Sequence, residues 1–250
     1  MRGFLALLVL LAAAPPAMAQ GTPNPIRRPA PDFLFEKPRG SVTVRGSWLF
    51  SRGQSDWYDF VTTQLTLQPR DFNAPGFGVD VNVPISSRFE GQFAFDISRS
   101  SQLSEYRAFV DNNRLPIEQT TTLREINLGG NIRYLPLGRG SAVSRLAWVP
   151  RKVVPFVGGG AGVINYDLQQ VGDFVDFVDF SVFADSFDSH GWAPSAQVFA
   201  GADIRVFKRM YVTIDGRYLW AADELGLDWV NFAPIDLAGF KLSAGVSFSY

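Results

Sequence analysis

The chain has 250 residues, no cysteine and one histidine, and its formal net charge is −1 at pH 7. This near-neutral balance argues against a nucleic-acid partner, because a general nucleic-acid binder shows a basic excess. The absence of cysteine excludes a disulfide scaffold and a thiolate metal site.

The beginning of the chain is predicted to be a secretory signal peptide, residues 1–19. The basic residue Arg2 precedes an apolar run, and the small residues Ala17 and Ala19 provide a cleavage site. The apolar run is too short for a helical membrane anchor, which needs about 20 residues. We therefore expect an exported protein.

Residues 20–40 form a proline-rich segment that is predicted to be an extended tether and a plain linker. Its prolines are Pro23, Pro25, Pro29, Pro31 and Pro38. The third segment, residues 41–250, is predicted to be one folded domain.

Within residues 41–250 the dominant pattern is a two-residue period of apolar and polar side chains, which is typical of β-strands. In the last segment, for example, Phe240, Leu242 and Val246 alternate with Lys241 and Ser243. The predicted strands are residues 41–51, 77–85, 89–98, 123–134, 153–168, 195–207, 210–220 and 236–250.

The two faces of these strands differ in charge. The polar positions, which are every second residue along each strand, include six acidic and five basic residues: Arg45, Asp80, Glu90, Asp96, Glu125, Arg133, Asp203, Arg205, Asp215, Arg217 and Lys241. The apolar positions, which alternate with the polar ones, include aromatic residues near the strand ends: Trp48, Phe50, Tyr134, Tyr166, Tyr218, Trp220 and Tyr250. An apolar band between aromatic girdles predicts an all-β fold, an eight-stranded antiparallel up-and-down transmembrane β-barrel. A soluble eight-stranded barrel is the alternative.

One strand is less clear than the others. In residues 153–168 we assign the parity of Val154, Phe156, Ile164, Tyr166 and Leu168 to the apolar face, opposite Asn165 and Asp167. The glycine run in this segment weakens the alternation and suggests a bend or close backbone packing.

The predicted connections alternate in length. The turns at residues 84–88 and 207–209 are short, as periplasmic turns are, whereas the connections after the first, third, fifth and seventh strands are long. Residues 61–67 of the first long connection could continue a strand above the membrane. Residues 135–152 are longer and basic, and the alternation of sides assigns them to the periplasm.

The export signal, the eight strands and the ending "AGVSFSY" resemble the small outer-membrane β-barrels of Gram-negative bacteria. This group includes the membrane domain of outer membrane protein A and the outer membrane protein W family. The resemblance implies a location in the cell outer membrane, with outer-membrane lipids and lipopolysaccharide as partners. It also implies that the barrel-assembly machinery reads the last strand, which ends at Tyr250.

An eight-stranded barrel has a bore that side chains can fill. Because unpaired charge is costly away from water, we expect paired charges to close this bore rather than leave an open pore. The predicted function is that of a non-enzymatic barrel with a structural or surface-interaction role. The resemblance to the W-type barrels adds the passage of a small hydrophobic ligand.

The alternative function is an outer-membrane hydrolase, either lipid A-modifying or a protease, that uses His190 and Asp188. An extended backbone would place both side chains on one face. The histidine is followed by Gly191 and Trp192, so the His-x-Ser arrangement of lipid-deacylating barrels is missing. We therefore assign no catalytic residue, no metal ligand and no cofactor.

The segment "GDFVDFVDFSVFADSFDSH", residues 172–190, contains five aspartates and no basic residue except its histidine. Its three-residue repeat does not match the two-residue period of a β-strand. We interpret the segment as an external loop where the strand pattern stops, with a short helical piece as one possibility. Its phenylalanines are expected to pack on the barrel rim or on other loops. A weak divalent-cation contact is the alternative role for its carboxylates.

Overall fold

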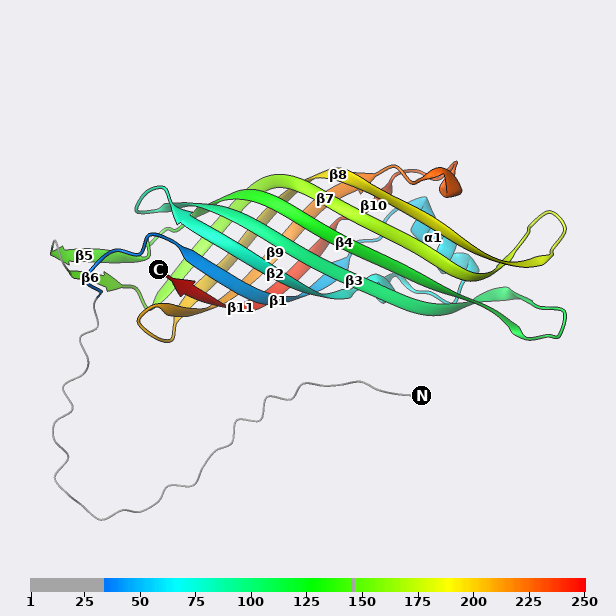
Figure 1. The fold of residues 1–250 in the computed structure, drawn as a ribbon, viewed down its shortest axis with the longest axis horizontal. Helices are drawn as coiled ribbons and strands as arrows, with labels where there is room; N and C mark the ends of the chain where they lie inside the picture. The colour runs from blue at the N-terminus through cyan, green and yellow to red at the C-terminus, as the bar shows by residue number, and fades with distance from the viewer. Residues whose placement is uncertain (1–33, 145–146) are drawn as a thin grey trace, which may run out of the picture. The chain divides into compact units, whose positions relative to one another are not determined.

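A computed structural model describes residues 34–144 and 147–250, and strands make up most of them (Figure 1). These residues belong to one unit, Asp32–Tyr250. The elements in chain order are β1 (Ser41–Ser51), α1 (Asp56–Gln64), the 3₁₀ helix η1 (Pro69–Phe72), β2 (Ala74–Pro84), β3 (Phe89–Val110), β4 (Pro116–Tyr134), β5 (Gly140–Ser144), β6 (Ala147–Pro150), β7 (Val153–Val175), β8 (Val182–Arg205), β9 (Met210–Asp223), the 3₁₀ helix η2 (Leu227–Trp229), β10 (Ile235–Asp236) and β11 (Gly239–Ser249).

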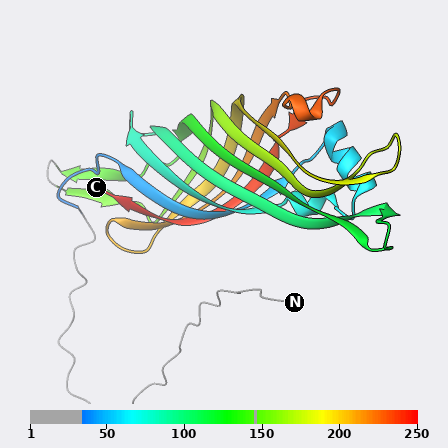
Figure 2. The ribbon, with the colours of Figure 1, turned by 45° about the vertical axis from the view of Figure 1, so that its right-hand side comes forward.

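Eight of the strands close into an antiparallel ring in the order β1, β2, β3, β4, β7, β8, β9 and β11. The ring closes where β11 pairs with β1, from Ser41 opposite Ser249 to Ser51 opposite Gly239. The ring of strands is visible in Figures 1 and 2. The predicted eight-stranded antiparallel barrel is confirmed, and each predicted strand corresponds to one strand of the ring.

Four strands of the ring are much longer than the alternation predicts. β3, β4, β7 and β8 have 22, 19, 23 and 24 residues. Their pairing continues well past the level where β1 and β2 end, so they project beyond the rest of the wall in Figure 1. Much of the predicted third and fifth connections is therefore strand.

The prediction that the strand pattern stops throughout residues 172–190 is wrong. The β7–β8 ladder continues to Val175 opposite Val182, and only residues 176–181 form the connecting turn. No helix forms there. The segment contains the top of a long β-hairpin, and its triplet repeat spans the end of β7 and the turn.

The two ends of the barrel carry different structures. The end with α1, η1 and η2 is called the mouth end below; the other, with the short turns, the β5–β6 hairpin and Tyr250, is called the turn end (Figures 1 and 2). The suggestion that residues 61–67 continue a strand is wrong, because residues 61–64 belong to α1. Asp56 and Asp59 favour this helix, since acidic residues in the first turn interact well with the helix dipole. Within the described ranges, no helix is long and apolar enough to cross a membrane.

The wall separates apolar from polar side chains as the alternation predicts. Apolar residues such as Val44, Phe93 and Leu242 are exposed on the outside. Ten of the eleven predicted interior charged residues are buried, and the remaining one, Arg205, is half-buried.

The assignment of faces in residues 153–168 is wrong. Val154, Phe156, Ile164, Tyr166 and Leu168 are buried inside the barrel, so Tyr166 takes no part in an outer aromatic girdle. The outward positions of β7 hold valines and polar residues instead. Ile164, Tyr166 and Leu168 belong to an apolar cluster inside the barrel, and Val154 and Phe156 pack with Leu135 and Phe199.

The predicted signal peptide, residues 1–19, and most of the predicted tether lie outside the described residues. The described part of the predicted tether, residues 34–40, also contacts the folded domain. Leu34 and Trp148 form an antiparallel bridge, with N–H···O distances of 2.8 and 2.9 Å in the two directions. Leu34 is buried by this contact with the β5–β6 hairpin.

Candidate functional site

The middle of the lumen is filled by a central charge cluster, formed by Arg45, Asp80, Asp96, Asp215, Arg217 and Lys241. Arg45 is 1 % exposed and contacts two carboxylates. Its Nε and Nη2 donate to the two oxygens of Asp80 at 2.9 and 3.1 Å, and Nη2 also donates to Asp96 Oδ2 at 2.8 Å. Such a bidentate contact suits the planar guanidinium group.

The other cations of the central charge cluster share the same carboxylates. Arg217 Nη1 lies 3.7 Å from Asp96 Oδ2, and its Nε lies 3.9 Å from Asp215 Oδ2. Lys241 Nζ lies 3.6 Å from Asp96 Oδ1. The cluster thus combines three basic with three acidic groups, and its side chains come from β1, β2, β3, β9 and β11. The paired charges occupy the bore, as the sequence predicts.

Amide side chains link this cluster to the opposite wall of the lumen. Gln197 Oε1 accepts a hydrogen bond from Arg217, and Gln197 Nε2 donates to Asn131. Asn131 donates to Gln92, which donates to Asn82. The chain of bonds runs across β8, β4, β3 and β2 and satisfies polar groups that lie away from water.

A lower charge cluster closes the turn end of the lumen and consists of Glu90, Arg133, Arg139 and Asp203. Arg133 Nη2 and Arg139 Nη1 both lie 3.1 Å from Asp203 Oδ2. Arg139 also holds Glu90 through two hydrogen bonds, and Arg133 lies 3.8 Å above the ring of Phe156. Arg139 was missed by the sequence reasoning, because it lies in the connection after β4, where no alternation marks an inward residue.

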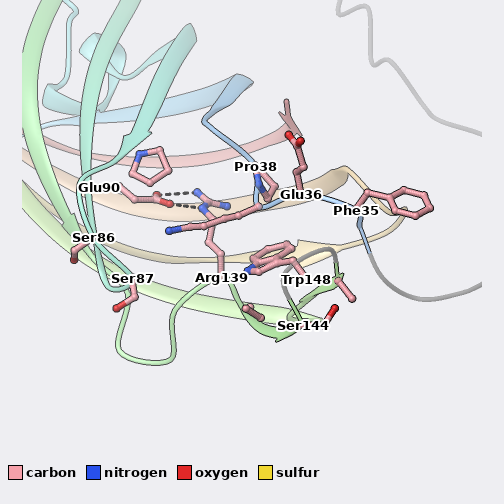
Figure 3. A pocket seen from close by; sticks show the side chains of 14 residues that line it. Phe35, Glu36, Pro38, Ser86, Ser87, Glu90, Arg139, Ser144 and Trp148 are labelled. Carbon is pink, nitrogen blue, oxygen red and sulfur yellow. Dashed lines mark hydrogen bonds and ion pairs between the residues drawn. The ribbon is translucent and has the colours of Figure 1, made fainter.

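A pocket of about 300 Å³ lies beside the lower charge cluster at the turn end. Figure 3 shows Arg139 paired with Glu90, with Trp148 and Pro38 close by. The pocket lies between the N-terminal residues Phe35–Pro38, the turn after β2 and the β5–β6 hairpin.

The mouth end of the lumen contains a cluster of different character, called the apolar plug. Trp57, Tyr58 and Val61 of α1 point into the barrel and are at most 1 % exposed. Trp57 packs edge-on against Tyr58, Phe72 and Trp229, with ring centroids 4.9, 5.7 and 5.9 Å apart. The plug comprises Trp57, Tyr58, Val61, Leu65, Leu67, Phe72, Tyr106, Ile117, Leu123, Ile164, Tyr166, Leu168, Val175, Ala193, Leu219, Trp229, Ile235 and Leu237. This packing explains why Ile164, Tyr166 and Leu168 of β7 are apolar although they face the lumen.

Polar contacts fasten the plug to the mouth end. Arg52 donates to both oxygens of Asp236 at 2.7 and 2.9 Å, and the backbone N–H of Gln54 donates to the same carboxylate. The carboxylate of Asp56 accepts from the backbone N–H of Ala233 at 2.9 and 3.1 Å. The first and last long connections are therefore tied to each other across the mouth.

Above the plug lies an aromatic pocket of about 210 Å³, called the mouth pocket. Phe174 and Phe187 form one side, with ring centroids 4.5 Å apart, and Trp229 lies next to Phe187. Its lining residues are Phe60, Leu65, Tyr106, Gln119, Gln170, Phe174, Val175, Phe177, Phe183, Phe187, Asp228, Trp229 and Phe232. Five of them belong to the acidic segment 172–190, and four of these five are phenylalanines. This confirms that the phenylalanines of the segment pack on other loops and on the rim.

The aspartates of that segment bond to the backbone of their own turn. Asp176 Oδ1 accepts from the N–H of Val178 at 2.7 Å, and Asp179 Oδ1 accepts from the N–H of Ser181 at 2.9 Å. The bond from Ser181 lowers the pKa of Asp179. Among the residues that the structure describes, no group of three or more acidic or histidine side chains is arranged to hold a metal ion.

His190 and Asp188 lie on β8, on one face as predicted for an extended backbone. His190 Nδ1 is 3.6 Å from Asp188 Oδ2, and the two side chains are 77 % and 57 % exposed. The intervening Ser189 is buried on the lumen side, where its hydroxyl lies 2.8 Å from Tyr166 Oη. The pair therefore faces outward, away from the lumen and from the mouth pocket.

A closed ring of eight strands, with an apolar outer surface and paired charges inside, defines the chain as a small transmembrane-type β-barrel. No protein-family model and no curated protein matches its sequence.

Solved structures of small outer-membrane barrels are similar to it. The outer membrane protein OprG from Pseudomonas aeruginosa is 9% identical with a TM-score of 0.46, covering 87% of this chain and 99% of its own. Neisserial surface protein A is 12% identical with a TM-score of 0.45, covering 84% and 97%. Ail, the attachment invasion locus protein of Yersinia pestis, is 13% identical with a TM-score of 0.45, covering 84% and 99%.

Proposed function

We propose that the chain is an integral outer-membrane barrel, exported through residues 1–19, that has no open pore and binds small apolar compounds in the mouth pocket. The observation that carries this proposal is the mouth pocket itself. Aromatic side chains from three connections converge on a hollow of about 210 Å³. Small-molecule sites are concave, mostly apolar and furnished with a few polar groups, and Gln119, Gln170 and Asp228 supply these here.

The absence of an open pore rests on the contents of the lumen. The apolar plug fills the mouth half and the central charge cluster fills the half below it. A compound bound in the mouth pocket would have to displace both to move straight through the bore. The proposed role is therefore capture at the cell surface.

The experiment is equilibrium dialysis of radiolabelled naphthalene against the barrel in lipid nanodiscs, with empty nanodiscs as the background. The variant Phe60→Asp/Phe187→Asp places two carboxylates in the mouth pocket and should weaken binding by about tenfold or more. The control Phe35→Asp changes an exposed phenylalanine at the turn end and should bind like the wild type. Equal binding by wild type and pocket variant would refute the role of the pocket.

Membrane insertion is tested separately by fractionation and by electrophoresis of boiled and unboiled samples. A protein that stays soluble and shows no heat-dependent shift would refute the barrel's location. In planar bilayers, we expect no steady conductance from the wild type. We further propose that the last strand, with Tyr250 at its end, is what the barrel-assembly machinery recognises; deleting Tyr250 should then slow insertion.

A further inference from the structure

Two arginines lie directly opposite each other on the outer wall of β3 and β4. Arg99 and Arg124 are register partners, and both point outward, since their neighbours Ser98, Ser100 and Glu125 are buried on the lumen side. Like charges directly opposite one another destabilise a strand pair. The pair therefore does not serve the pairing of these strands.

The two arginines differ in their partners. Arg124 Nη2 donates to Asp167 Oδ2 on β7 at 2.9 Å, and both side chains of this pair are 43 % exposed. Arg99 is exposed, and the part of the chain that the structure describes offers its guanidinium group no ion pair or hydrogen bond. The β3–β4 face thus retains an uncompensated positive charge at this level.

The side chains below and above the arginines change in character. Below them, towards the turn end, Ile97 faces Ile126 and Phe95 faces Leu128, which continue the outer apolar surface. Above them, Ser101 faces Thr122, and their hydroxyl oxygens lie 2.9 Å apart. The guanidinium groups therefore lie at the boundary between an apolar and a hydroxyl-bearing stretch of wall.

A shallow hollow of about 270 Å³ adjoins Arg99 on the apolar side. It lies between β2 and β3 and is lined by Pro75, Gly76, Phe77, Ile97, Ser98 and Arg99. An apolar floor with a cation at its upper rim suits an acyl chain that carries an anionic group at its end.

We infer that this surface binds one phosphorylated glycolipid of the outer leaflet. Arg99 and Arg124 hold its phosphate, the hollow over Phe77 and Ile97 receives an acyl chain, and the hydroxyls above meet its sugars. Arginine forms bidentate contacts with phosphate, and two adjacent guanidinium groups suit the double negative charge of a phosphate monoester. The hydroxyl-bearing stretch favours a phosphorylated sugar lipid over a glycerophospholipid. The inference rests on the proposed location in the outer membrane.

The test is native mass spectrometry of the barrel in non-ionic detergent, titrated with bis-phosphorylated lipid A. The wild type should retain one lipid A, and Arg99→Gln/Arg124→Gln should bind it at least about tenfold more weakly. The control Lys208→Gln/Arg209→Gln removes the same charge from the turn between β8 and β9, and should bind like the wild type. Equal binding by both variants would overturn the assignment.

A second arm changes the lipid instead of the protein. Lipid A without its phosphates should bind to the wild type as weakly as intact lipid A binds to the arginine variant. Phosphatidylglycerol should bind more weakly than lipid A, and equal retention of the two would overturn the preference for a glycolipid. Each sample is first checked for its heat-dependent gel shift, so loss of the barrel is distinguished from loss of the lipid site.

Discussion

The two halves of the lumen are closed by opposite means. Below the mouth, the central charge cluster joins strands of the wall through direct contacts between arginine, lysine and aspartate. At the mouth, the apolar plug closes the bore with side chains from α1 and the loops, most of them far from water. The comparison indicates that one half is closed by the wall itself and the other by a separate piece of chain packed inside it.

This difference has consequences for stability. Removing one partner of a buried ion pair leaves a charge without compensation, whereas removing an apolar side chain leaves a cavity. The first change acts on the strands that form the ring. The second acts on a connection that the ring does not need for closure.

The largest effect is expected from Arg45→Ala. Asp80 and Asp96 lose the guanidinium group that they share, and breaking a buried pair costs about 4 kcal/mol of the free energy of unfolding. The measurement is urea unfolding of the barrel in lipid vesicles. Stability equal to that of the wild type would show that water, rather than Arg45, compensates the two carboxylates.

Trp57→Ala should cost about 3 kcal/mol, because it opens a cavity in the apolar plug. The loss should be local: limited proteolysis should cut residues 52–73 while the heat-dependent gel shift of the ring persists. If the ring unfolds together with this connection, the two halves of the lumen form one cooperative unit. That result would contradict the statement that the ring closes without the plug.

Glu125→Gln should stabilise the barrel, in contrast to Arg45→Ala and Trp57→Ala. Glu125 is buried between the two halves, close enough to Tyr58 and to Lys241 for its charge to act on both. The described residues give its carboxylate no hydrogen bond or ion pair. An amide is cheaper to bury than a carboxylate, so the free energy of unfolding should rise by about 1 kcal/mol in the same urea experiment. A loss of stability would identify a partner for the charge.

The smallest effect is expected from His190→Ala. The side chain is 77 % exposed on the outer wall, so the free energy of unfolding should change by less than about 0.5 kcal/mol. Neither the wild type nor the variant should release acyl chains from lipid A or cleave peptides. An activity that the wild type has and the variant lacks would support the hydrolase alternative.

The sequence predicts the ring well because strand pairing imposes a strict two-residue period. The pattern in residues 41–51 or 236–250 needs no knowledge of the partner strands, since lipid selects apolar side chains along one whole face. The same reasoning identifies Arg45, Asp96 and Arg217 as interior residues. Which carboxylate each cation contacts depends on the register between the strands, and the alternation of apolar and polar residues does not reveal that register.

The misassigned face of β7 shows where this reasoning fails. Ile164 and Tyr166 face a plug supplied by a connection more than ninety residues earlier in the chain, at Trp57 and Tyr58. In this part of β7 the inward positions are apolar and the outward ones include Asn165, Asp167 and Gln169, so the alternation alone assigns the wrong face to the lumen. The long hairpins were missed for a related reason, because above the membrane neither face is selected for lipid.

The pairing of β1 with β11 also determines when the barrel can be completed. Ser41 and Ser249 are neighbours in the ring although almost the whole described chain separates them. Until the last strand is available, β1 and β9 each keep an unpaired edge, and open strand edges invite association with other chains. Assembly therefore depends on pairing between strands that lie near opposite ends of the described chain, and folding that relies on contacts of such large sequence separation is slow. A nascent chain that stops before Gly239 should be an aggregation-prone sheet rather than a smaller barrel.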